Sequence, residues 1–155
     1  MLTSDCLRLL AYDDWANQRV VTALRSAAKV PERALQRFAH LIAAKETWLA
    51  RVLVIATPDT VRPVRTLDEI EARAHAVHTE WSSFLATMPA ERLESVLHYR
   101  NLQGEACSST LADILIHLVI HGSYHRGQIA ADLGAAGAIP VATDFILAAR
   151  TGQIP

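Results

Sequence analysis

The sequence has little cysteine, no long apolar run and no excess of either charge. Cys6 and Cys107 are the only cysteines among 155 residues, too few for a disulfide framework. We expect small buried thiols, with a redox pair as the alternative. No apolar run reaches the ~18 residues that span a bilayer, and the chain does not begin like a secretion signal. We therefore expect a soluble cytoplasmic protein without a membrane partner.

The charge balance argues against a nucleic-acid partner. The sequence holds 15 basic and 16 acidic residues, for a formal net charge of -1. Proteins that bind nucleic acid through the phosphate backbone require an excess of positive charge, which this chain lacks. The length suits one domain over residues 1–155 and is too short for two full-sized domains.

Apolar residues recur at helical spacing in four long segments. Asp5, Asp13 and Asp14 lie toward the start of the first segment, and Arg25 and Lys29 lie at its end, which suits the helix dipole. The predicted helices span residues 3–28, 31–55, 66–88 and 110–134, and a short helix is expected at 143–150.

Residues with strong positional preferences mark the helix starts. Pro31 suits the first residue of the second helix, because its missing N–H has no partner there. Thr66 and Glu69 fit a capping box at the third, and Ser109 or Thr110 is expected to cap the fourth. Thr143 or Asp144 is the expected cap of the short last helix.

The segment 90–106 is less regular and predicts at most a short extended excursion. Residues 57–65 hold two prolines and predict a loop. Four amphipathic helices without convincing strands indicate an all-α four-helix bundle with a short C-terminal helix.

Three histidines recur every fourth residue in the most apolar helix: His117, His121 and His125. His121 and His125 lie one turn apart on the same face and can chelate one divalent metal ion. His117 lies ~12 Å from His125 along the axis, too far to share that ion comfortably. The same pair also fits a solvated face. The other residues of this helix are strongly apolar, however, and burying two imidazoles among them without partners would cost roughly several kcal/mol. A bound metal ion would remove that cost.

A mononuclear site normally needs a third protein ligand. His40 flanks the apolar stripe of the second helix, but spacing alone does not single it out. His75 and His78 stand among charged residues and indicate a solvated face, with a second metal site as the less favoured reading. His98 lies in the irregular segment.

Four sequence blocks together resemble the DinB/YfiT-like family of metal-dependent proteins, and they occur in the same order across nearly the whole chain. The most specific is a histidine-rich turn followed by His-Arg-Gly-Gln. The blocks are residues 12–17 (Tyr-Asp-Asp-Trp-Ala-Asn), 40–49 (from His40 to Trp48 and Leu49), 117–129 and 140–146.

The resemblance implies a four-helix bundle with a metal site formed by His40, His121 and His125. Its remaining coordination positions would be open to water or substrate, as in catalytic sites. Three neutral imidazoles suit zinc, nickel, iron or cobalt, and the sequence does not choose among them. The resemblance also implies a homodimer.

The family resembles bacterial thiol S-transferases. The resemblance therefore implies a metal-dependent transferase, or hydrolase, that acts with a low-molecular-weight thiol on a small electrophile. One alternative is a non-catalytic metal-binding stress-response protein. A third is a helical bundle whose histidines bind nothing tightly.

Further residues of the fourth helix are candidates for a role beside the metal. His117 is a possible base or a packed helix residue, and Tyr124 a possible hydrogen-bond donor to substrate. Arg126 is a possible anion ligand, or ties the bundle together through an acidic residue such as Asp144. Ile120 stands where relatives often carry asparagine, so a polar contact of theirs is missing here.

Buried polar and aromatic residues are expected in the first two helices. Trp15 and Trp48 are expected in the core rather than in a substrate cage. Asn17 is expected to bond across helices, because a buried amide needs partners.

Overall fold

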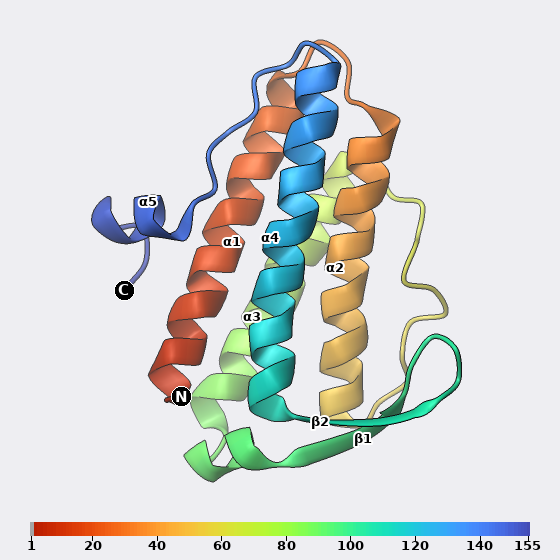
Figure 1. The fold of residues 1–155 in the computed structure, drawn as a ribbon, viewed down its shortest axis with the longest axis vertical. Helices are drawn as coiled ribbons and strands as arrows, with labels where there is room; N and C mark the ends of the chain where they lie inside the picture. Colours follow the sequence, from red (N-terminus) through yellow and green to blue (C-terminus); the bar gives the residue numbers. More distant parts are fainter. Residues whose placement is uncertain (1) are drawn as a thin grey trace.

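The computed structural model describes residues 2–155, which form a bundle of four long helices (Figure 1). A short fifth helix lies beside the first. The predicted all-α bundle with a short C-terminal helix is confirmed. The helices are α1 (Thr3–Ser26), α2 (Glu32–Leu53), α3 (Leu67–Thr87), α4 (Leu111–Ala135) and α5 (Phe145–Arg150).

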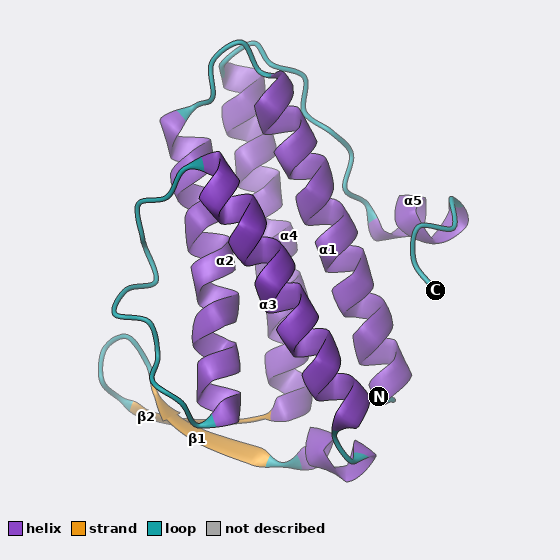
Figure 2. Ribbon diagram, turned by 180° about the vertical axis from the view of Figure 1, so that it is seen from behind, coloured by secondary structure: helices purple, strands orange, loops and turns teal. Residues whose placement is uncertain are grey.

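A crossover linker, residues 54–66, determines how the helices are ordered. It leaves the end of α2 and runs back along the outside of the bundle, so α3 runs in the same direction as α2 (Figures 1 and 2). Each of α1 and α2 packs against both α3 and α4. The helices α2 and α4 lie side by side and run in opposite directions (Figure 1).

The helix boundaries follow the capping residues. Thr66 and Glu69 form the predicted capping box, and the Thr110 side chain accepts the Asp113 N–H. Pro31 was predicted as the first residue of the second helix. It is instead the N-cap residue, and α2 begins one residue later, at Glu32. Asp144 is the N-cap residue of α5, but its side chain makes no capping hydrogen bond.

The segment before α4 is more ordered than the sequence indicates. After a 3-10 turn, η1 (Ala90–Glu94), β1 (Val96–Arg100) pairs antiparallel with β2 (Ala106–Thr110). The expected extended excursion is thus a hairpin, and its second strand was missed because that strand consists of small residues without apolar alternation. The hairpin crosses the end of the bundle beneath α2 and α4 (Figure 2).

The core lies between the four helices. Its largest fully buried apolar side chains include Phe38, Leu41 and Ile42 from α2, Trp81 from α3 and Leu118 from α4. Large side chains from three helices thus fill one continuous interior, which fixes α2 against α4. Within residues 2–155, no helix combines the length and the apolar character needed to cross a membrane.

The two cysteines are both free thiols, and they lie in different environments. Cys6 is buried in the core, as expected, whereas Cys107 on β2 is half-buried. The expectation of small buried residues is therefore confirmed for Cys6 and only partly met by Cys107.

Candidate metal centre

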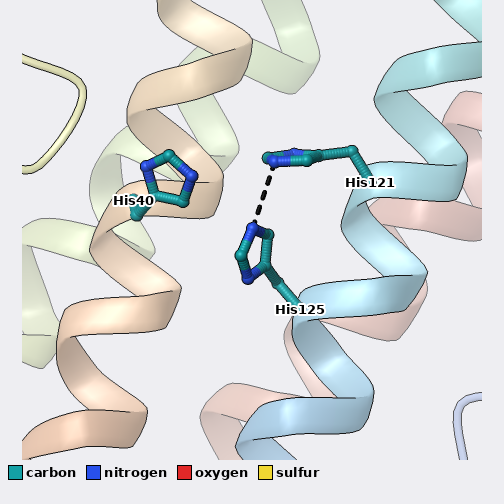
Figure 3. A group of neighbouring side chains, drawn as sticks. All are labelled: His40, His121 and His125. Carbon is teal, nitrogen blue, oxygen red and sulfur yellow. Dashed lines mark hydrogen bonds between the residues drawn. The ribbon is translucent and has the colours of Figure 1, made fainter.

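Three imidazoles meet between α2 and α4 (Figure 3). His40 projects from α2, and His121 and His125 project from successive turns of α4. One ring nitrogen of each residue lies within 4.8 Å of one ring nitrogen of the others. Among residues 2–155 this is the one group of three potential ligands that meets so closely, and all three side chains are partly buried.

Carbonyl oxygens orient two of these rings. His40 Nδ1 lies 2.6 Å from the Val61 carbonyl oxygen, and His125 Nδ1 lies 2.9 Å from Gln128 Oε1. A carbonyl oxygen only accepts hydrogen bonds, so each Nδ1 donates its proton. The Nε2 atoms of both rings therefore keep their lone pairs for another partner.

The free nitrogens point into the cluster. His125 Nε2 lies 3.1 Å from His121 Nε2 (Figure 3). The His40 ring lies nearly perpendicular to the His125 ring, with 4.9 Å between their centroids. Metal-binding histidines typically donate their other N–H to a carbonyl or carboxylate. The donor set and its surroundings thus fit a divalent ion.

The surroundings of His121 and His125 favour their neutral forms. Burial, assisted by the neighbouring imidazoles and Lys45, lowers the pKa of His121 to about 4. Burial also lowers the pKa of His125 and that of His117. Because a metal ion binds the neutral imidazole, few protons compete for these nitrogens at pH 7.

Gln128 links the cluster to a salt bridge between the two helices. Its Oε1 atom accepts from Arg37 Nη1 at 2.8 Å as well as from His125. Arg37 Nε in turn donates to Asp132 at 2.8 Å. These contacts fix His125 relative to α2. Neither Gln128 nor Arg37 is distinguished by its spacing, although Gln128 belongs to the His-Arg-Gly-Gln block that could have indicated it.

An aromatic cavity of about 390 Å³ opens on one side of the cluster. The rings of Trp48 and Tyr99 lie 4.9 Å apart, and the Arg51 guanidinium covers both, 4.7 Å from the Trp48 centroid. Trp48 was expected in the core; it contacts the core and also forms part of the cavity wall. The residues that line the cavity include His40, Trp48, Arg51, Tyr99, His117 and His121.

A cationic cavity of about 450 Å³ opens on the other side. His40 and Arg62 line both cavities, so these two residues separate the aromatic cavity from the cationic one. The histidine cluster is thus accessible from two chemically different spaces. The cationic cavity is lined by Arg33, Gln36, Arg37, His40, Arg62, Tyr124, His125 and Gln128.

The remaining candidates of α4 fall into different surroundings. His117 is largely exposed rather than packed in the core, but its ring lies against Trp48 and His121 with centroids 5.9 and 5.2 Å away. This contact removes water from part of the ring, which is the partial burial that lowers its pKa. Tyr124 is exposed at the mouth of the cationic cavity. Ile120 is 64% exposed, so an asparagine there would face solvent rather than cross the bundle.

Arg126 points away from the cluster into a buried charge network. Its Nη1 atom donates to Asp13 at 2.7 Å and to Asn17 at 2.9 Å, and its Nη2 atom donates to Ser123. The expected role of Arg126 in tying the bundle together through an acidic residue is confirmed, but that residue is Asp13 on α1 and not the suggested Asp144. The expected role of Asn17 in joining helices is confirmed.

Asp13 is the centre of this network. Its carboxylate also pairs with Lys45 of α2, and all three charged side chains are buried. The expected role of Asp13 at a helix start was wrong, because it lies in the middle of α1. Burial and the charge of Arg126 lower the pKa of Lys45.

The other histidines lie outside the cluster. His75 on α3 and His98 on β1 are exposed, and His78 is half-buried. Trp15 is half-buried and packs beside Tyr12 and Phe145 in a small cluster between α1 and the C-terminal segment. None of these residues contributes to the three-histidine group.

Comparison with known proteins is consistent with this architecture. "Protein DinB" of Bacillus subtilis (strain 168) is 25% identical over 156 residues, covering 89% of this chain and 90% of that protein. A sequence model of the DinB family matches residues 2–153, almost the complete chain. On this evidence, the chain belongs to the DinB family.

Proposed function

We propose that this protein binds one divalent metal ion through His40, His121 and His125 and uses it to react a small thiol with a small electrophile. The observation that carries the proposal is the anchoring of Nδ1 in His40 and His125, which leaves both Nε2 atoms directed to a common point. Imidazole ligation suits zinc, nickel, iron or cobalt. Such an ion would provide open coordination positions and increase the acidity of a thiol or water.

The chain itself supplies binding surfaces and a proton acceptor. Trp48 and Tyr99 offer aromatic faces against which a planar or apolar electrophile packs. His117 lines the same cavity, and burial lowers its pKa, so its ring is neutral at pH 7. An unprotonated nitrogen of that ring is available to accept the proton of a reacting thiol.

Metal content tests the first half of the proposal. The purified protein, loaded with zinc and desalted, should hold about one ion per chain, measured by mass spectrometry. His40→Ala and His121→Ala should lose it. His98→Ala, at an exposed histidine of the hairpin, is the matched control and should retain it. No bound ion after loading with zinc, nickel, iron or cobalt would overturn the proposal.

Thiol consumption tests the second half. With an activated aryl chloride and 2-mercaptoethanol, a C–S bond forms and the C–Cl bond breaks, releasing chloride and a proton. The loaded protein should accelerate chloride release, and His117→Ala should slow it while keeping the metal. If the protein holds its ion but does not accelerate chloride release, the catalytic half of the proposal is overturned. The protein would then be a non-catalytic metal-binding protein.

A further inference from the structure

Positive charge gathers in the cationic cavity beside the histidine cluster. Three arginines line it, Arg33 and Arg37 from α2 and Arg62 from the crossover linker. Within residues 2–155, no carboxylate lines either this cavity or the aromatic one. The chain as a whole carries a formal charge of -1, so this concentration of positive charge is local.

Two of the three guanidinium groups are available to a ligand. Arg37 is occupied by Asp132 and Gln128. The guanidinium groups of Arg33 and Arg62 make no ion pair or hydrogen bond with any residue in the described range; Arg62 bonds only through its backbone N–H, to Thr60. Both side chains line the same cavity.

The linker holds Arg62 next to the cluster. The neighbouring Val61 carbonyl is bonded to His40, and Arg65 pairs with the buried Glu46 of α2 at 2.8 Å. Arg33, Arg62, His40 and His125 all line this one cavity. A ligand group bound by these arginines therefore lies within a small molecule's length of the three imidazoles.

We infer that the cationic cavity is a carboxylate-binding subsite, so that the thiol taken by this protein carries an acidic group. Arg33 and Arg62 would bind the carboxylate, since the planar guanidinium fork matches its two oxygens. The aromatic cavity then remains for the electrophile. This inference rests on the proposed function and specifies its substrate class.

Matched thiols test the assignment. Calorimetric titration of the zinc-loaded protein would compare 3-mercaptopropionate with its uncharged amide, 3-mercaptopropionamide. We expect the acid to bind about tenfold more tightly, as for one charged hydrogen-bonded contact. The double variant Arg33→Gln, Arg62→Gln should lose this preference while binding the amide as before. Arg150→Gln, at an exposed arginine of α5, should keep it. Equal affinities in the unchanged protein, or a preference that survives the double variant, would overturn the inference.

A second measurement separates this inference from the metal proposal. Succinate contains no sulfur, and its binding to the metal-free protein is observable by NMR through the Nε–Hε signals of Arg33 and Arg62. Shifts of these signals support the subsite even if no metal ion binds, an outcome that would overturn only the proposed function. Absent shifts, in a protein that does bind zinc and thiol, overturn the subsite alone. Shifts with inorganic phosphate but not with succinate overturn the carboxylate assignment.

Discussion

The hydrogen bonds of Nδ1 distinguish His40 and His125 from the other histidines of the chain. One bond ends at a backbone carbonyl of the linker, and the other ends at the side chain of Gln128. The backbone partner cannot be removed by substitution, but Gln128 can. Gln128 therefore offers a direct measure of how much ligand orientation matters.

Replacing Gln128 with alanine should weaken metal binding. His125 would lose the acceptor that fixes its ring, and loss of such outer partners typically costs about 10–100-fold in affinity. Competition with a chromophoric chelator would measure the change. Gln18→Ala is the control, because Gln18 lies on the exposed face of α1 and its side chain, among residues 2–155, hydrogen-bonds only to Asp14. Unchanged affinity in Gln128→Ala would contradict this account of His125.

Asp13 should be far more sensitive to substitution than its partner Lys45. Asp13→Asn leaves two buried cations without a counter-charge and should reduce the free energy of unfolding by about 3–5 kcal/mol. Lys45→Met leaves the Asp13–Arg126 pair intact and removes a cation whose burial is already unfavourable, so the loss should be below about 1 kcal/mol. Urea denaturation of both variants would test this, and equal losses would disagree with it.

Among individual residues, the sequence predicts those whose partners are close to them along the chain. The spacing of His121 and His125 is sufficient to suggest a chelating pair, whereas His40 is identified only through the family resemblance. Arg126 and Asp13 are separated by 113 positions. Their pairing depends on how α1 packs against α4, which periodicity does not determine, so Asp144 was chosen wrongly.

Gly122 shows what α4 requires in order to pack against α1. A Cβ atom at this position would lie 2.5 Å from Asp13 Oδ1 and 2.9 Å from Arg126 Nη1. Both atoms belong to the buried charge network and cannot move without losing hydrogen bonds. A glycine in the middle of a helix is unfavourable by roughly 0.5–1 kcal/mol relative to alanine, so packing here outweighs helix propensity.

Alanine substitutions at the two central glycines of α4 should therefore have opposite effects. Gly122→Ala should destabilise the fold by about 1–3 kcal/mol, as expected for overpacking. Gly127→Ala is the matched control, since a Cβ atom there meets nothing within 4 Å. It should stabilise by up to about 1 kcal/mol through helix propensity. Thermal unfolding would measure both; a stabilised Gly122→Ala would be inconsistent with the close approach.

A helix can be predicted from the sequence where the spacing of apolar residues, or a capping residue at its start, determines it. Apolar spacing predicts all four long helices, and Thr66 and Thr110 mark two of their starts. The hairpin is different, because β2 is held by its pairing with β1 and by its place under the bundle. A strand of small residues such as β2 has no periodic apolar pattern of its own.

The folded molecule partly buries a group of imidazoles and so disfavours their protonation, which should make its stability depend on pH. Burial lowers the pKa of His121 to about 4, and it lowers the pKa of His117 and His125 as well. In the unfolded chain these groups titrate near 6.5. Below that pH the unfolded state binds more protons than the folded state, so acid favours unfolding.

The metal-free protein should therefore be stable above pH 6.5 and lose stability progressively as the pH falls toward 4. Melting temperatures measured by circular dichroism across this range would show it. The variant His121→Asn removes the histidine whose pKa burial lowers to about 4 and should flatten the dependence. A melting temperature independent of pH between 6.5 and 4 would contradict the burial of these rings.

The arrangement of the helices is the part of the fold least evident from the sequence. Two prolines predict a loop near residues 57–65, but not that it runs back along the outside of the bundle. That course makes α2 and α3 parallel, and it brings Val61 to His40 and Arg62 to the cationic cavity. The site thus depends on a segment that has no secondary structure of its own.

The crossover linker also divides the ligand set. His40 precedes it and the other two histidines follow it, while residues 53–60 lie exposed on the surface. A single proteolytic cut there would give two polypeptides, neither with a complete set of ligands. An ion bound by all three histidines would then join separate molecules, so that the two fragments should reassociate more tightly as the zinc concentration rises. The protein would behave as a metal-dependent fragment-complementation pair, whose assembly reports directly on occupancy of the site.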